Sequence, residues 1–141
     1  MAGYEMEQKY ILFDTKRVKS FKVDEKYSSR MLLDDEMVGR RTVQINEGTV
    51  EPGARLGGGV HEDDEIYYIL SGDGILIIGD AEEKVEAGYL VFIPAGTFHA
   101  LYNTNNEKKM ELLTFWREPS SNDVYEKRMN EWGSAFVLEE S

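Results

Sequence analysis

The chain has 141 residues but no cysteine, only two histidines and only three prolines. The absence of cysteine excludes disulfides, thiolate catalysis and cysteine-ligated zinc or iron–sulfur sites. No apolar run reaches the roughly 18 residues that a membrane helix needs. The N-terminal stretch also lacks the basic region and the apolar segment of a signal peptide. We therefore expect a cytoplasmic protein.

Negative charge dominates the composition, with 27 Asp and Glu against 16 Lys and Arg and a net charge of −11. An acidic surface repels the phosphates of nucleic acids and of anionic lipids. We therefore expect no nucleic-acid or membrane partner, which leaves a small-molecule ligand or substrate. The length and the 41% content of hydrophobic residues are sufficient for a buried core, so we expect a single domain over residues 1–141.

Most of the chain consists of short segments rich in β-branched and aromatic residues, with turn residues between them. Closely spaced strands of this kind predict an all-β sandwich or barrel, whose core we place at about residues 40–117. Segment 8–45 is also expected to contain strands, although its register is not defined by the sequence. The other expected strands are residues 40–48, 65–74, 75–88 (a hairpin that turns near Gly79 and Asp80), 89–96 and 110–116.

The exception to the strand pattern is the segment at residues 120–133. Ser121 or Asn122 can cap the start of a helix there, and Gly133 can end it. We therefore expect a short C-terminal helix at about residues 121–132, packed on the outside of the β body.

The two histidines lie in the stretches with the strongest chemical signal. His61 precedes a strand, and residues two or four apart in a strand share a face, so His61 and Glu65 can both point inward. Pro94 and Gly96 form a turn ahead of a further strand, which can direct His99 into the same interior. Two imidazoles and one carboxylate with open coordination positions are typical of non-haem Fe(II) sites.

The two stretches resemble the paired motifs of the cupin superfamily. In the first motif, G-x5-H-x-H-x3-4-E-x6-G, the matching residues are Gly53, His61, Glu65 and Gly72. In the second, G-x5-P-x-G-x2-H-x3-N, they are Gly88, Pro94, Gly96, His99 and Asn103. The resemblance covers about residues 50–105 and implies a cupin-type antiparallel β-barrel or jelly roll. Because the first histidine of the family motif falls on Gly59, the implied set of four ligands is reduced to three.

The resemblance implies one divalent metal ion held by His61, Glu65 and His99. Fe(II) or Mn(II) is favoured, while Zn, Ni and Cu stay open because the same donors accept several metals. Asp63 has the parity to face inward and to replace the missing ligand; the alternative is a solvated turn. The family often forms dimers, and pairing would cover exposed strand edges, so we expect a homodimer. The remaining motif positions are assigned structural roles: Gly53, Gly72, Gly88, Pro94, Gly96 and Asn103.

Tyr67 shares the parity of Glu65 and can act as a catalytic acid or as a hydrogen-bond donor to a substrate. The alternative is an aromatic ring that fills the barrel. Arg41, Gln44 and Trp116 are further candidates for the wall of a substrate pocket. No serine or cysteine accompanies either histidine, so acyl transfer is not expected.

Three functions fit these residues. The first is a metal-dependent enzyme that acts on a small polar molecule by oxygenation, isomerisation or lyase chemistry, with a dioxygenase favoured by the ligand set. The second is a non-catalytic module that binds or senses a small ligand, which the missing ligand at Gly59 supports. The third is a metal-free sugar isomerase or epimerase, with a histidine and Tyr67 as acid–base pair.

Overall fold

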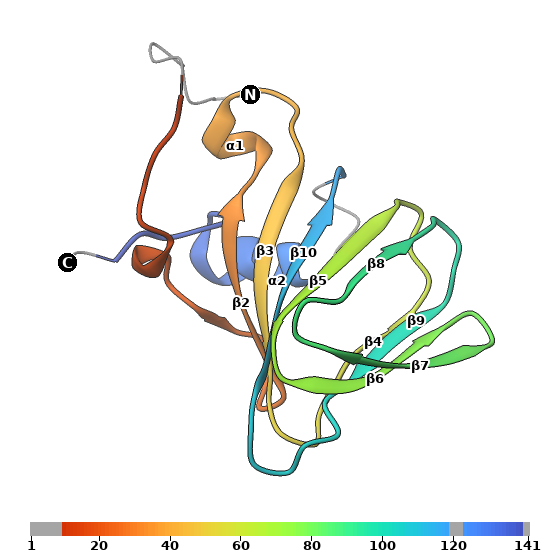
Figure 1. Cartoon of the computed structure of the whole chain (residues 1–141). Coiled ribbons are helices and arrows are strands. Elements are labelled where there is room, and N and C mark those ends of the chain that lie inside the picture. The colour runs from red at the N-terminus through yellow and green to blue at the C-terminus, as the bar shows by residue number, and fades with distance from the viewer. Residues whose placement is uncertain (1–9, 119–122, 140–141) are drawn as a thin grey trace.

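The computed structural model describes residues 10–118 and 123–139. Its strands form two antiparallel sheets (Figure 1). The large sheet has the order β1-β2-β3-β10-β5-β8, and the small sheet has the order β4-β9-β6-β7. The strands are β1 (Phe21–Lys22), β2 (Tyr27–Leu33), β3 (Gln44–Val50), β4 (Arg55–Gly59), β5 (Glu65–Ser71), β6 (Asp73–Ile78), β7 (Ala81–Glu86), β8 (Leu90–Ile93), β9 (His99–Tyr102) and β10 (Met110–Trp116). The helices are η1 (Thr15–Arg17), α1 (Asp35–Val38) and α2 (Asp123–Trp132).

The inner face of the large sheet changes from apolar to polar along its strands. Burial alternates along β3 and β10, as expected when one face of a sheet is covered. At one end, Val50, Met110 and Leu112 are completely buried and pack in the core with residues of the small sheet. At the other end, the same face carries Asn46 and Glu65. Buried polar side chains therefore gather at one end of the interior, and we look for a functional site there.

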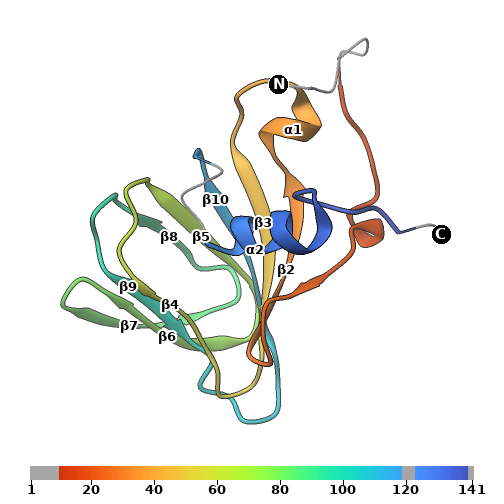
Figure 2. The same ribbon diagram turned by 180° about the vertical axis from the view of Figure 1, so that it is seen from behind.

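Helix α2 covers part of this inner face rather than the outside of the β body. Figure 2 shows it lying across β2 and β3. Its Arg128 is 2% exposed and hydrogen bonds to Ser29 and Asn46, whose side chains are buried on the inner face. At its end, the amide of Gly133 donates to the carbonyl of Met129 at 2.9 Å. The expectation of a helix is confirmed, but the expected position on the outside is wrong.

The predicted all-β fold is confirmed, and the strand expected at residues 110–116 coincides with β10. The hairpin expected near Gly79 is formed by β6 and β7. The strand expected at 65–74 ends early, because Gly72 adopts a φ of +88° and redirects the chain into the small sheet. The strand expected at 40–48 is shifted, since β3 begins only at Gln44.

The N-terminal segment contains β1 and β2 as expected, but also two short helical turns. The side chain of Asp14 caps η1 and that of Asp34 caps α1, where it accepts from the amide of Met37 at 2.9 Å. The expected caps of the C-terminal helix, Ser121 and Asn122, lie outside the described residues. Within the described ranges, no helix is long and apolar enough to cross a membrane. The homodimer stays a prediction.

Candidate metal centre

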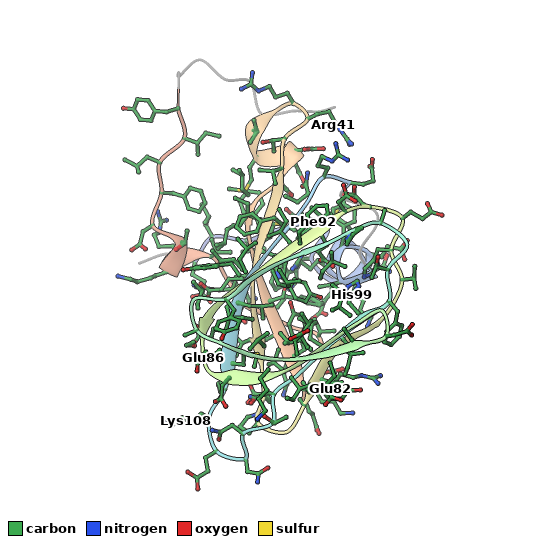
Figure 3. All side chains as sticks on the ribbon, turned by 45° about the vertical axis from the view of Figure 1, so that its right-hand side comes forward. Arg41, Glu82, Glu86, Phe92, His99 and Lys108 are labelled. Carbon is green, nitrogen blue, oxygen red and sulfur yellow. The ribbon has the colours of Figure 1, made fainter. Side chains whose placement is uncertain are left out.

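His99 lies at the start of β9, inside the barrel (Figure 3). Its ring is held at both nitrogens. The Nδ1 atom lies 3.0 Å from the carbonyl oxygen of Thr97, and the Nε2 atom lies 3.1 Å from Oε1 of Glu65. Glu65 is the first residue of β5 and is buried as well. Two chain segments 34 residues apart thus meet at a histidine–glutamate pair.

His61 completes the cluster from the loop between β4 and β5. Its ring centroid lies 5.0 Å from that of His99. One ligand atom each of His61, Glu65 and His99 lie within 4.8 Å of one another, and this is the cluster of metal-ligating side chains found among the described residues. His61 and Glu65 both point into the site as expected, but not through strand spacing, because the chain bends between them and the loop brings His61 to the site.

The loop that carries His61 is anchored to the turn that precedes β9. The amide of Gly96 donates to the carbonyl of His61 at 2.8 Å, and the amide of Ala95 donates to Oδ1 of Asp64 at 2.9 Å. Gly96 has a φ of +79°, a conformation that side chains other than glycine rarely adopt. The second motif therefore positions a ligand of the first as well as its own.

The electrostatics of His99 call for a cation. Both ring nitrogens face oxygen acceptors, whereas a neutral imidazole carries only one N–H. Burial lowers the pKa of His99, but the hydrogen bonds with Glu65 and with the Thr97 carbonyl outweigh it, so the pKa lies above its usual value. A second proton on the ring would satisfy both contacts, and a metal ion held by His99 and Glu65 would remove the need for that proton.

One pair of the donor set, His99 and Glu65, has the spacing of ligands to one metal ion. Imidazole nitrogens and carboxylate oxygens bind such ions at about 2.0–2.2 Å, so two of them at a right angle lie about 3 Å apart. The separation of 3.1 Å between Nε2 of His99 and Oε1 of Glu65 agrees with this geometry. The Thr97 carbonyl can only accept, so its contact favours the tautomer with the proton on Nδ1, in which the Nε2 lone pair is available for a metal. The sequence did not predict the role of Thr97, because the contact is made by its backbone carbonyl, which every residue has.

Asp63 does not join this cluster. Its Oδ2 accepts hydrogen bonds of 2.8 Å from the amides of Arg117 and Glu118, just after β10. Burial raises the pKa of Asp63, but these amides and the charge of Arg117 hold it below the usual value. Of the two alternatives for Asp63, the replacement ligand is corrected: the residue lies in the loop, where strand parity does not apply, and its carboxylate anchors the loop to the end of β10.

Tyr67 lies on the inner face of β5, next to His99. The two rings meet edge to face, with centroids 5.8 Å apart. Tyr67 also belongs to the hydrophobic core. Burial, together with the charge of Glu65, raises the pKa of its phenol well above 10. Tyr67 therefore retains its proton and packs as a wall beside the histidine.

The three expected pocket residues have different surroundings. Arg41 lies away from His99 (Figure 3), and it forms ion pairs with Asp35 and Glu118. Its side chain is 66% exposed, so the expectation that it lines the pocket is corrected; it precedes β3 and has no strand parity.

Gln44 and Trp116 do face the interior, as a cross-strand pair of β3 and β10. The amide of Gln44 is engaged by Asp35 and by the carbonyls of Thr42 and Arg117, which leaves it a structural role. The indole nitrogen of Trp116 is buried and has no hydrogen-bond partner.

Gly59 lies opposite His99 in the β4–β9 ladder. A Cβ atom added there would meet nothing within 4 Å, and the φ of Gly59 is not in the left-handed region. A groove of about 680 Å³ runs past this position, with His61, Tyr27 and Val124 among its lining residues. The groove lies between β4 and α2 and gives solvent access to the His61 side of the cluster, past the three glycines Gly57, Gly58 and Gly59.

The outer motif residues support the strands that carry the site. Asn103 is buried, and its Nδ2 donates to the carbonyls of Val50, Glu51 and Lys108 at 2.8–3.2 Å. The amide of Gly53 donates to the carbonyl of Asn105 at 2.9 Å. The remaining motif glycines, Gly72, Gly88 and Gly96, all have positive φ angles and form turns. Pro94 accepts the hydrogen bond that closes the turn before β9, from the amide of Thr97.

Comparison with known proteins gives one family. A family model described as a cupin domain matches residues 46–116. Acireductone dioxygenase of Monodelphis domestica is 42% identical over 61 residues, which span 38% of this chain and 34% of the dioxygenase. An oxalate-binding protein of Thermotoga maritima is 32% identical over 76 residues, which span 53% of this chain and 63% of that protein. The chain thus covers less than two thirds of either relative.

Solved structures share the fold at low sequence identity. A predicted oxalate decarboxylase from Thermotoga maritima superposes with a TM-score of 0.68 at 21% identity, and covers 76% of this chain and 98% of its own. An RmlC-like cupin from Shewanella frigidimarina has the same TM-score at 14% identity, and covers 84% of this chain and 99% of its own.

Proposed function

The chain belongs to the cupin domain family, whose model matches residues 46–116, and on this premise we propose that it is a metal-dependent enzyme that acts on a small polar molecule. The observation that carries the proposal is the cluster of His61, Glu65 and His99, with ligand atoms within 4.8 Å of one another. These three residues would hold one divalent ion, with Fe(II) or Mn(II) favoured by the two-histidine-one-carboxylate set.

A bound ion would supply Lewis acidity and open coordination positions at the end of the groove. The residues of the chain prepare this position. Thr97 orients the ring of His99, while Gly96 holds the loop of His61. Tyr67 and the core beneath it keep water away from the inner side of the cluster. The groove beside Gly59 admits the substrate.

Dioxygenase chemistry is the first choice for the reaction. Its support is the ligand set together with the 42% identity to an acireductone dioxygenase over 61 residues. Because the match spans only 34% of that protein, its substrate is not transferred to this chain.

Ligand binding without turnover is the second candidate. The similarity to an oxalate-binding protein favours it, as does the absence of a fourth protein ligand at Gly59. The metal-free isomerase is less well supported: Tyr67 is buried among apolar side chains, and no hydrogen bond joins it to either histidine in the described part of the chain.

The decisive experiment measures metal content per chain on anaerobic, untagged protein reconstituted with Fe(II) and with Mn(II). Near-stoichiometric metal is expected in the wild type and in Glu62→Gln, which removes an exposed acid from the same loop. Glu65→Gln, His61→Ala and His99→Ala should lose most of the metal. Absence of metal from the reconstituted wild type would refute the proposal.

Turnover separates the two candidates once metal is bound. An oxygenase consumes O₂ in the presence of its substrate and stops when the metal is chelated. A binding module is stabilised against heat by a ligand that is recovered unchanged, and it consumes no O₂.

A further inference from the structure

Two side-chain atoms in the described residues are buried without any hydrogen-bond partner: Nε1 of Trp116 and Nε of Arg128. Both are donors that cannot accept. A buried donor without an acceptor costs free energy, so such groups need an explanation. Trp116 lies on β10 of the large sheet, and Arg128 lies on helix α2, which packs against the inner face of the same sheet.

The register places Trp116 beside the candidate metal centre. Phe115 pairs with Ile66, so the next residue of β10, Trp116, lies beside Glu65 on the inner face. Two residues back, Thr114 pairs with Asn46 of β3. Arg128 donates to Oδ1 of Asn46 at 2.9 Å and also hydrogen bonds to Ser29. The two unsatisfied donors thus flank one region of the interior.

Arg128 is a buried cation that has no neighbouring anion among residues 10–118 and 123–139. Its hydrogen-bond partners among the described residues, Ser29 and Asn46, are neutral and contact only Nη2. No carboxylate in those residues lies within ion-pair distance of the guanidinium, and Asp34 acts on it only at longer range. Burial lowers the pKa of Arg128 to about 10, so the group remains charged near neutral pH. Buried charges are normally paired or bound to a ligand.

We propose that the interior between the candidate metal centre and α2 binds a carboxylate-bearing anion, which accepts hydrogen bonds from the guanidinium of Arg128 and the indole N–H of Trp116. An acceptor-only, anionic group satisfies both donors and neutralises the cation. A guanidinium recognises a carboxylate better than an ammonium does, because its planar fork presents parallel donors. The inference names the substrate class of the proposed site and so rests on the proposed function.

The groove between β4 and α2 gives access to this side of the interior. The groove reaches this region at Tyr27, whose hydroxyl accepts from Nδ2 of Asn46 at 3.2 Å. The chain has a net charge of −11 and therefore repels anions, so an anionic ligand needs a local positive charge such as that of Arg128.

The test compares succinate with succinamide, which has the same chain length but no charge, by calorimetric titration of the protein after reconstitution with Fe(II) or Mn(II). The wild type should bind succinate at least about tenfold more tightly than succinamide. Arg128→Gln should abolish this preference. Lys108→Gln removes the same charge from an exposed position away from His99 (Figure 3) and should retain it. Equal affinities in the wild type, or an unchanged preference in Arg128→Gln, would overturn the inference.

A second pair of variants covers the case in which Arg128→Gln fails to fold. Trp116→Phe keeps an aromatic ring in the core and removes only the indole donor, so succinate should bind several-fold more weakly. Arg128→Met should melt at the same or a higher temperature than the wild type without ligand, because a buried unpaired charge is lost. A lower melting temperature with an unchanged succinate preference would make Arg128 a structural anchor of α2 and refute its role in binding.

Metal content is measured on the same samples. If the wild type holds metal but does not prefer succinate, this inference fails and the proposed function stands. If no sample holds metal but the preference depends on Arg128, the proposed enzyme fails and the anion site stands.

Discussion

The backbone amide of Gly96 donates to the carbonyl oxygen of His61 at 2.8 Å, and this bond joins the turn before β9 to the loop before β5. His61 comes from a loop, so no strand ladder fixes it. Its position depends on this bond and on the bond between Ala95 and Asp64. The geometry of the three candidate ligands is therefore only as rigid as the contact between the two turns.

We expect Gly96→Ala to weaken metal binding by about tenfold, the lower end of the effect of losing an outer-shell partner. A Cβ at this position meets nothing within 4 Å, so the effect comes from the φ of +79°, which alanine adopts only under strain. Gly133→Ala is the matched control, since Gly133 has a φ of +70° and equally open surroundings at the end of α2. Both variants should lose about 1 kcal/mol of stability, and only Gly96→Ala should lose affinity in a competition titration with a chelator. Equal affinities would show that the turn does not position His61.

Gly59→His should raise metal affinity by roughly tenfold or more, because a further imidazole is added at the cluster. Gly59 lies opposite His99, has room for a side chain and needs no left-handed backbone. Gly58→His is the control, because Gly58 has a φ of +105° and a Cβ there would lie 3.1 Å from Cζ of Arg55. The same chelator competition measures both. Unchanged affinity in Gly59→His would place this position outside the coordination sphere.

Asp63→Ala should lower stability by about 1–3 kcal/mol and leave metal affinity unchanged. Its carboxylate accepts from the amides of Arg117 and Glu118, so the substitution leaves two donors without their partner. Denaturant unfolding gives the first quantity and metal titration the second. Glu65→Ala provides the opposite result, a loss of metal. If Asp63→Ala released the metal as well, Asp63 would have to be counted among the ligands.

The sequence predicted those parts of the fold that local patterns determine. Alternation and flanking turns located β10 and the β6–β7 hairpin. The trio His61, Glu65 and His99 was predicted from residue spacing and from a family resemblance. The spacing argument needed extended structure from His61 to Glu65, whereas the chain bends between them.

The alternation of side chains between the two faces of a strand gives no information about a residue that lies outside a strand. Asp63 was considered as an inward-facing ligand or as a turn residue, and Arg41 as a candidate for the pocket wall, but Asp63 lies in a loop and Arg41 precedes β3. Arg128 could not be found from sequence at all. An arginine on a short helix is usually solvated, and only the packing of α2 onto the inner face of a distant sheet makes it a buried cation.

Asn103→Ala should cost about 2–4 kcal/mol of stability without changing the metal content of the folded protein. The side chain is 2% exposed, and its amide nitrogen serves the carbonyls of Val50, Glu51 and Lys108. These bonds hold the end of β9 against the end of β3 and the loop before β10, far along the barrel from His99. Asn103→Asp keeps the shape but removes the donors, so it should be at least as destabilising. Denaturant unfolding and metal analysis of the same samples separate the two roles: a loss of metal from fully folded Asn103→Ala would mean that the motif asparagine acts on the site rather than on the scaffold.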